Sequence, residues 1–161
     1  MISAIVAVNN DWGIGYNGDL LEHIPEDLKY FKTLTTDHVV VMGQNTWDSL
    51  PKKPLPDRLN VVITYNERHF DEMTAFIDLN EAITRLKTAD DECFIIGGGS
   101  IYKQLLPFCD RVYVTKIYKS HEQVDTYFPN LDELDEWSPK ACSPIQTYKD
   151  LTYQFWQYDR I

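Results

Sequence analysis

The chain has 161 residues, of which 43% are hydrophobic and 13% aromatic, and this predicts one globular domain, residues 1–161, with a sizeable core. Its formal net charge is −10 and its pI is about 4.7, which disfavours binding to the phosphate backbone of nucleic acids. No apolar run approaches the ~20 residues that a membrane span requires, and the first residues are typical of a strand rather than a signal peptide. We therefore expect a soluble, cytoplasmic protein.

The cysteines and histidines do not indicate a metal site. The three cysteines include no CxxC pair, and the four histidines are scattered without the spacing of metal ligands. Neither a disulfide framework nor a bound metal is predicted.

Short β-rich runs alternate with helical patterns, which predicts an α/β fold. The predicted strands are Ile2–Val8, His38–Met42, Leu59–Thr64, Ala75–Ile77, Cys93–Ile96, Arg111–Ile117 and Tyr153–Tyr158. The predicted helices are Pro25–Leu34, Gln44–Leu50, Leu79–Ala89 and Ser100–Leu105. Several strands, such as AIVAV and VVVMG, are continuous apolar runs typical of strands buried on both faces. We expect a predominantly parallel sheet of about eight strands, with about four flanking helices and an antiparallel C-terminal strand at one edge.

The segment NNDWGIGYNGD, residues 9–19, follows the first strand. A loop of this length between compact elements is often a functional lid. Its apolar residues Trp12, Ile14 and Tyr16 argue against a disordered surface loop.

Asp27 lies inside the apolar stripe that Ile24, Leu28 and Phe31 form on the first predicted helix. An aspartate in such a place is ordinarily a cap, an ion-pair partner or a sign of a misjudged helix phase. An unpaired buried carboxylate has a raised pKa and costs stability, so it persists mainly where a ligand or a reaction uses it. Asp27 is therefore a candidate functional residue, with the ordinary interpretations left open.

The segment VVVMGQNTW, residues 39–47, places a glycine and polar residues between a strand and a helix. Taken alone, Thr46 would be an ordinary helix cap.

Arg58 precedes the buried strand in PLPDRLNVVIT, residues 54–64. An arginine at a strand entrance can bind a carboxylate through two hydrogen bonds, although a solvated surface arginine is the simpler interpretation.

The segment IIGGGSIY, residues 95–102, repeats the arrangement of residues 39–47 with three glycines. Glycines at a helix start admit an anion close to free backbone N–H groups, although a tight turn would look the same and the G-x-G-x-x-G pattern is incomplete. Two such units in one domain favour binding of a dinucleotide pyrophosphate.

Taken in chain order, these segments resemble the bacterial-type dihydrofolate reductase family over nearly the whole chain. The most specific matches are IPEDLKYFK, IIGGGSIY and VDTYFP. The resemblance implies reduction of 7,8-dihydrofolate to 5,6,7,8-tetrahydrofolate with NADPH as cofactor, which supplies one-carbon metabolism and thymidylate, purine and glycine synthesis. It also implies a monomer that antifolates inhibit.

The resemblance implies that Asp27 binds the edge of the pterin ring of the substrate. There it would help a proton to reach N5 while hydride passes to C6. Thr115 would orient Asp27, and Arg58 would bind the glutamate α-carboxylate. The remaining substrate-binding residues that it implies are Ile5, Ala7, Leu28, Phe31, Lys32 and Leu50.

The cofactor site that the resemblance implies is larger. Residues 9–23 would form a mobile active-site loop, and the Gly97–Gly98 peptide bond would be cis. The implied cofactor-binding residues are Ala7, Ile14, Gly15, Asn17, Gly18, Asp19, Leu20, Gly43, Gln44, Asn45, Thr46, Thr64, Tyr65, Ile96, Gly97, Gly98, Gly99, Ser100, Ile101 and Tyr102.

Leu21 and Glu22 stand where most members of the family carry Pro-Trp. Glu22, a candidate catalytic residue, would either hold a water through its carboxylate or turn outward. If it faced inward, a second carboxylate near Asp27 would raise the apparent pKa of the pair.

A second difference from the family pattern, besides Leu21 and Glu22, concerns the 2′-phosphate of the cofactor. The family usually places Arg or Lys at positions that here are Gln44, Asn45, Thr64 and Tyr65. We therefore expect either a weakened preference for NADPH over NADH or a dependence on Arg68, on His69 or on a lysine that the sequence does not place.

Two other functions remain as alternatives. Another pteridine or riboflavin-pathway reductase on the same fold is disfavoured because Asp27 is accompanied by Arg58, which a folate tail needs. A nucleotide-binding module without catalysis is disfavoured by Asp27, Thr115 and the two glycine turns.

Overall fold

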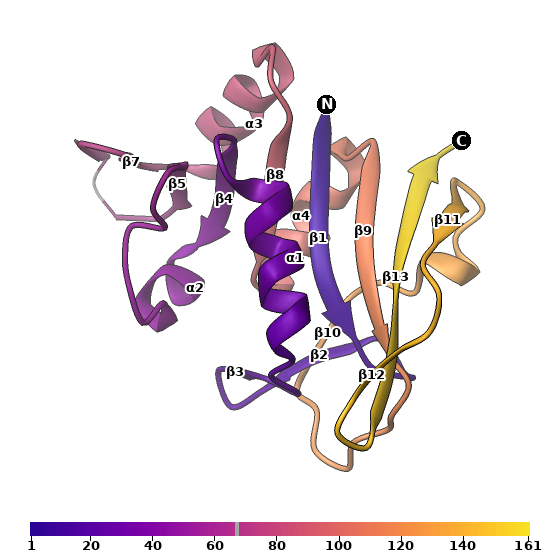
Figure 1. Ribbon diagram of the computed structural model, residues 1–161. Coiled ribbons are helices and arrows are strands. Elements are labelled where there is room, and N and C mark those ends of the chain that lie inside the picture. The colour runs from indigo at the N-terminus through magenta and orange to yellow at the C-terminus, as the bar shows by residue number, and fades with distance from the viewer. Residues whose placement is uncertain (67) are drawn as a thin grey trace.

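The computed structural model describes residues 1–66 and 68–161. Within these ranges the main sheet has ten strands in the order β11-β13-β9-β1-β8-β4-β5-β7-β6, with β12 paired to β13 (Figure 1). These strands are β1 Ile2–Val8, β4 Val39–Gly43, β5 Leu59–Ile63, β6 His69–Asp71, β7 Thr74–Ile77, β8 Cys93–Gly97, β9 Arg111–Ile117, β11 Trp137–Cys142, β12 Gln146–Tyr148 and β13 Leu151–Arg160.

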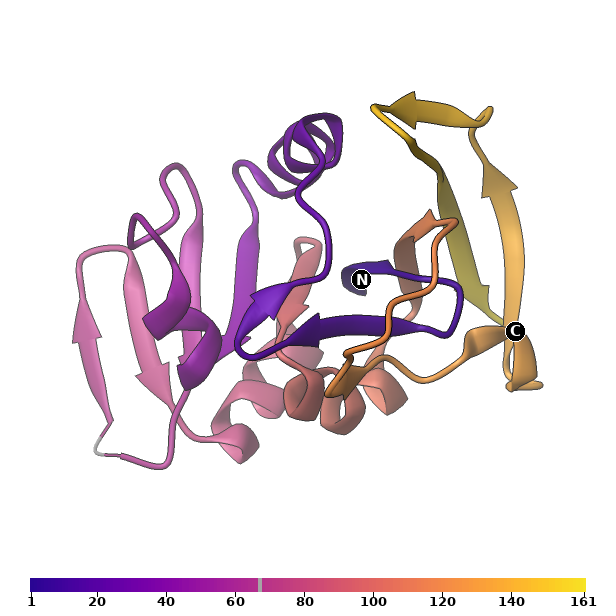
Figure 2. The ribbon, with the colours of Figure 1, turned by 90° about the horizontal axis from the view of Figure 1, so that it is seen from below.

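The strands from β9 across to β7 are all parallel, so their carboxyl ends meet at one edge of the sheet. Helix α1, Pro25–Thr35, covers one face, whereas α3, Leu79–Thr88, and α4, Gly99–Leu105, cover the other (Figure 2). Helix α2, Gln44–Ser49, follows β4 at the carboxyl edge. Burial on both faces explains why the central strands are continuous apolar runs.

Side chains of β1 alternate between the two cores. Ala4 and Val6 pack on the side of α3 and α4, whereas Ile5 belongs to the cluster with Phe31 of α1 and Trp47 of α2. The same alternation in β9 places Thr115 beside Ala7 in the paired register, at the carboxyl edge. Ligands of open α/β sheets bind at this edge.

All four predicted helices and all seven predicted strands are present, with small shifts at their ends. The sheet is larger than the predicted eight strands because the short strands β6, β11 and β12 lack a continuous apolar run. The C-terminal strand is antiparallel to β9, as predicted, but its place at the edge was wrong. Strand β11 pairs with it from Trp137 to Cys142 and forms the edge, where Pro139 is tolerated.

Residues 9–23 are ordered by a second, three-stranded sheet of β10, Thr126–Tyr127, β2, Gly13–Tyr16, and β3, Asp19–Leu20. Figure 1 shows it crossing below the carboxyl ends of the main strands. Trp12 and Ile14 are buried, which confirms that this is not a disordered surface loop, whereas Tyr16 is exposed.

Residues 1–66 and 68–161 include no helix that is both long and apolar enough to cross a bilayer. They also bring together no group of three or more His, Cys, Asp or Glu side chains suited to hold a metal ion.

Candidate active site

Asp27 and Thr115 form the centre of the site. Thr115, only 2% exposed on β9, donates a hydrogen bond from Oγ1 to Asp27 Oδ1 at 2.6 Å. Burial raises the pKa of Asp27, and the hydrogen bond from Thr115 offsets part of this rise. Asp27 has thus neither of the ordinary roles, because its side chain does not cap α1 and its partner is a hydroxyl group rather than a cation.

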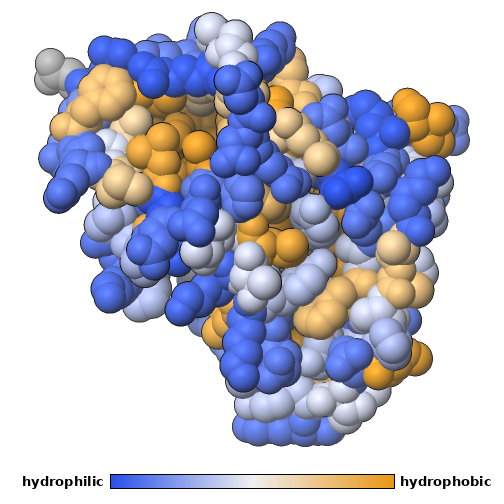
Figure 3. Space-filling view, turned by 45° about the horizontal axis from the view of Figure 1, so that its top comes forward, coloured by the Kyte–Doolittle hydropathy of each residue, from blue (hydrophilic) through white to orange (hydrophobic). Residues whose placement is uncertain are grey.

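The apolar stripe around Asp27 is only partly buried. Ile24 packs against Ile117 and Tyr153, and Phe31 is half-buried, but Leu28 is 54% exposed. The apolar stripe that the sequence indicates is therefore exposed to solvent at Leu28. Figure 3 shows apolar side chains exposed in hollows of this region of the surface, between polar residues.

Arg58 is 4% exposed, so the simpler interpretation as a solvated surface arginine was wrong. Its Nε donates to Pro56 O at 2.8 Å and its Nη1 donates to Thr35 Oγ1, at the end of α1, at 3.1 Å. Burial lowers its pKa, although nearby Asp57 acts in the opposite direction. These contacts fix the plane of a guanidinium group, which suits bidentate recognition of a carboxylate.

The two glycine turns lie on the neighbouring strands β4 and β8. Gly43 precedes α2 and Gly98 precedes α4, and neither helix start is capped by a side chain, so backbone N–H groups remain available for an anion. The turns are close together, because a Cβ on Gly98 would lie 3.3 Å from Thr46 Oγ1. The Gly97–Gly98 bond is cis, as the resemblance implies.

Ile101 and Tyr102 of α4 support the glycine turn at residues 97–99. Both side chains are buried, and the Tyr102 hydroxyl donates to Ile5 O at 2.6 Å, which ties α4 to β1. Their side chains therefore support the glycine turn, and its polar atoms come from the backbone.

Gly97→Ala is expected to lower the free energy of unfolding by about 1–3 kcal/mol and to weaken NADPH binding. Gly97 has φ +138°, which strains any L residue, and a Cβ would lie 3.4 Å from Thr46 Oγ1. The control is Gly18→Ala, where φ is +81° but nothing lies within 4 Å of the added Cβ, so the loss of stability should be smaller. Thermal unfolding and NADPH titration measure both effects. Unchanged melting and binding for Gly97→Ala would contradict the prediction.

The predicted loop residues approach the carboxyl end of β1. Ala7, Ile14 and Leu20 line a cavity of about 10 Å³, the volume of one water, together with Leu21, Glu22 and Ile117. Gly15 pairs with Thr126, and Asn17 N donates to Asp125 Oδ2 at 2.9 Å. Asp19 and Leu20 are exposed on β3.

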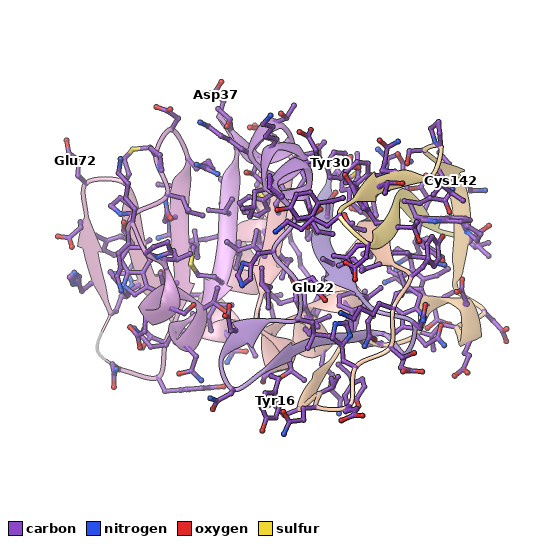
Figure 4. All side chains as sticks on the ribbon, turned by 60° about the horizontal axis from the view of Figure 1, so that its bottom comes forward. Tyr16, Glu22, Tyr30, Asp37, Glu72 and Cys142 are labelled. Carbon is purple, nitrogen blue, oxygen red and sulfur yellow. The ribbon has the colours of Figure 1, made fainter. Side chains whose placement is uncertain are left out.

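The carboxylate of Glu22 contacts the loop after β9, and its hydrogen-bond partners do not include Asp27. Its Oε1 accepts from Lys119 Nζ at 3.0 Å and from His121 Nε2 at 3.2 Å. Figure 4 shows Glu22 in the middle of the molecule, whereas Tyr16 projects from the rim. Burial acts to raise the pKa of Glu22, but the hydrogen bonds from Lys119 and His121 outweigh it and lower the pKa. The coupled pair of carboxylates that an inward Glu22 would form with Asp27 is therefore not observed.

The positions expected near the 2′-phosphate offer little positive charge. Gln44 donates to Asp48 at 3.0 Å, Thr64 is buried, and Tyr65 is 87% exposed. The two proposed substitutes are engaged elsewhere: Arg68 forms a bidentate ion pair with Glu81, at 2.8 Å, and His69 contacts Asp71.

Sequence reasoning missed Lys119 and His121, which contact Glu22, and Asn9, which contacts His121. No local pattern distinguishes them, since Lys119 and His121 lie 97 and 99 positions from Glu22 in the chain. The one available signal was the acidic residue at position 22, which is unusual for the family and needs a partner when half-buried.

Two glycine turns on neighbouring parallel strands, with a partly buried carboxyl group in the same site, are typical of dinucleotide-dependent oxidoreductases. The family model for dihydrofolate reductase matches residues 1–160. The chain belongs to the dihydrofolate reductase family.

Named relatives agree with this assignment. The chain is 38% identical to dihydrofolate reductase of Bacillus subtilis (strain 168), over 99% of this chain and 95% of the relative. It is 38% identical to the enzyme of Mycobacterium leprae (strain TN), over 99% and 98% of the two chains. The fold is similar to that of Enterococcus faecalis dihydrofolate reductase complexed with NADP(H) and RAB-propyl, with a TM-score of 0.87, 30% identity and coverage of 99% and 96%.

Proposed function

We propose that residues 1–161 form one catalytic domain that reduces 7,8-dihydrofolate to 5,6,7,8-tetrahydrofolate, with NADPH supplying the hydride. Membership of the family supports this function. The single observation that carries the assignment of residues is the Asp27–Thr115 hydrogen bond, because it orients the one carboxyl group that α1 directs at the carboxyl edge.

Asp27 is proposed to bind the pterin through both oxygens. Ionised, it accepts two hydrogen bonds, which match the N3–H and the 2-amino group of a 2-amino-4-oxopteridine. Thr115 donates a hydrogen bond to Oδ1 and so orients the carboxylate. The bound carboxylate favours proton uptake by the ring at N5, through water, while C6 receives the hydride. One proton and one hydride are thereby added across the N5=C6 bond.

The rest of the substrate is proposed to lie along α1. The apolar residues Ile5, Leu28, Phe31 and Leu50 form walls for the ring and the benzoyl group. Arg58 binds the glutamate α-carboxylate because Thr35 and Pro56 already orient its guanidinium group. Lys32, exposed on the same helix, adds positive charge at this end.

The cofactor is proposed to cross the carboxyl ends of β1, β8 and β4. The N–H groups that follow Gly43 and Gly98 contact its phosphates, with Thr46 between the two turns. Ala7 and Ile14, which line the small cavity together, contact the nicotinamide end.

The preference for NADPH over NADH is expected to be less than about 10² in kcat/KM, equivalent to about 2.7 kcal/mol. Arg68 is held by Glu81, so it contributes little charge to a 2′-phosphate. Glu81→Ala releases Arg68 and should raise the preference, whereas Arg68→Ala should leave it nearly unchanged. Steady-state kinetics with both cofactors measure it. A ratio above 10² in the unmodified enzyme would mean that another cation reaches the phosphate.

The test of the function is the dihydrofolate-dependent oxidation of NADPH by the purified chain. The alternative function is that of a different pteridine or riboflavin-pathway reductase. Such an enzyme would turn over another pterin or a ribitylaminopyrimidine, and its rate would depend little on the folate tail. Equal activity without the glutamate tail would favour that alternative.

Three further properties are proposed with the function. Diaminopyrimidine antifolates would compete with dihydrofolate because their protonated ring presents the same donors to Asp27. The chain would act as a cytoplasmic monomer. Its free thiols Cys93, Cys109 and Cys142 agree with a reducing compartment.

A further inference from the structure

Glu22 makes the only side-chain hydrogen bonds between residues 18–23 and the rest of the described chain. Strand β2 is held by its pairing with β10, and Asn17 donates to Asp125. Strand β3 pairs with β2 alone, and His23 contacts Asp19 inside the same loop. Among residues 1–66 and 68–161, the remaining hydrogen bonds from this segment to partners outside the loop are those of Glu22.

The partners of Glu22 also hold the other end of the loop. Asn10 N donates to Lys119 O at 3.0 Å, and its side-chain amide donates to Ser120 Oγ at 3.2 Å. Residues 119–121 therefore contact the loop where it leaves β1 and again where it approaches α1, which carries Asp27.

The hydrogen bonds around His121 fix its tautomer. Asn9 Oδ1 accepts from the backbone N–H groups of Asp11, at 2.9 Å, and Gly13, at 2.8 Å, so the amide cannot be reversed without losing both bonds. Its Nδ2 must then donate to His121 Nδ1, at 3.0 Å. His121 Nδ1 is an acceptor, and Nε2 carries the proton that is donated to Glu22.

Partial burial strengthens these contacts relative to the same contacts on an open surface. The side chains of Glu22 and His121 are 21% and 14% exposed, so solvent screens them less than a fully exposed pair. Lys119 is more exposed, at 46%, and neutralises the carboxylate from the solvent side.

We propose that Glu22 is a positioning residue, which with His121 and Lys119 fastens the active-site loop over the nicotinamide end of the cleft. Leu20 and Leu21, its neighbours, line the small cavity with Ala7 and Ile14, so a released segment would uncover that region. The kinetic consequences rest on the function proposed above, whereas the structural consequences do not.

The first experiment measures loop order without any ligand. Backbone ¹⁵N order parameters of residues 18–23 are expected to be near 0.85, the level of a rigid backbone, and to fall below about 0.6 in Glu22→Ala. The matched control is Glu122→Ala, the same change at an exposed glutamate of the neighbouring loop. The ¹⁵N shifts of His121 should also report the Nε2–H tautomer. Unchanged order parameters in Glu22→Ala would overturn the proposal.

The second experiment measures the kinetic effect. Glu22→Ala is expected to speed NADPH dissociation about tenfold, because hydrogen bonds to a charged group are lost, and Glu22→Gln should recover part of the difference since its amide oxygen still accepts. His121→Ala added to Glu22→Ala should change the rate little further. Additive effects, or equal rates for Glu22→Ala and Glu122→Ala, would overturn the proposal.

The two proposals fail separately. A chain that shows the loss of loop order but does not reduce dihydrofolate would retain the positioning role and lose the proposed function. A chain that reduces dihydrofolate but keeps its loop order in Glu22→Ala would retain the proposed function and lose the positioning role.

Discussion

Asp27→Asn is expected to lower kcat/KM for dihydrofolate at neutral pH by a factor of about 10² to 10⁴, the range of general acid–base assistance. An amide keeps the hydrogen bond from Thr115 but presents only one acceptor and no charge to the pterin edge. The loss should fall mainly on hydride transfer, measured in a single turnover, because the protonated ring is the species that accepts hydride.

The matched control is Glu26→Gln, which removes a neighbouring carboxylate of the same helical turn. Glu26 is exposed, and its one ion pair within residues 1–66 and 68–161 is with Lys29, at 3.3 Å, so this variant should behave as the unmodified enzyme. If Glu26→Gln and Asp27→Asn had the same activity, Asp27 would not have the role proposed for it.

The stability of the ligand-free protein should respond in the opposite direction. The folded pKa of Asp27 is raised above the unfolded value of 3.8, so its ionisation opposes folding as the pH rises through the folded pKa. Asp27→Asn removes this penalty and should raise the melting temperature at neutral pH. The gain should shrink as the pH falls toward 3.8, where the carboxyl group is protonated in the folded state.

Arg58→Lys is expected to raise KM for dihydrofolate about 10- to 100-fold with little change in kcat, as for the loss of a hydrogen bond to a charged group. An ammonium group lacks the planar fork that Pro56 and Thr35 hold in place. The variant is informative because it keeps the positive charge.

A substrate without the glutamate tail separates binding from misfolding. Both enzymes should reduce such a pterin at the same rate, because Arg58 has no partner on it. A parallel loss with the truncated substrate would instead mean that the buried arginine acts through the fold, and thermal unfolding would then show it.

The parts of the candidate site whose positions in the fold could be predicted are those encoded in consecutive residues. Each glycine turn is a strand, a glycine and a helix within ten residues, so its location at the carboxyl edge follows from the pattern alone. The inward direction of Asp27 follows from helical periodicity, and its hydrogen bond with Thr115 agrees with the family resemblance.

The parts that sequence reasoning missed depend on distant segments. Arg58 is buried because Thr35, 23 residues earlier, supplies its acceptor. The orientation of Glu22 is decided by Lys119 and His121, nearly a hundred residues later. Leu28 belongs to an apolar stripe yet is exposed. Helical periodicity shows which side chains share one face of a helix, but it does not show whether another element packs against each of them. The short edge strands have too few residues to show a period.

The transfer of deuterium from NADPH deuterated at the reactive C4 position of the nicotinamide tests the central claim most directly. The account predicts that the unmodified chain converts 7,8-dihydrofolate to tetrahydrofolate with one deuterium at C6, seen by mass spectrometry and proton NMR, and that Asp27→Asn does so far more slowly. Tetrahydrofolate without deuterium at C6, or labelled product formed equally fast by Asp27→Asn, would contradict it.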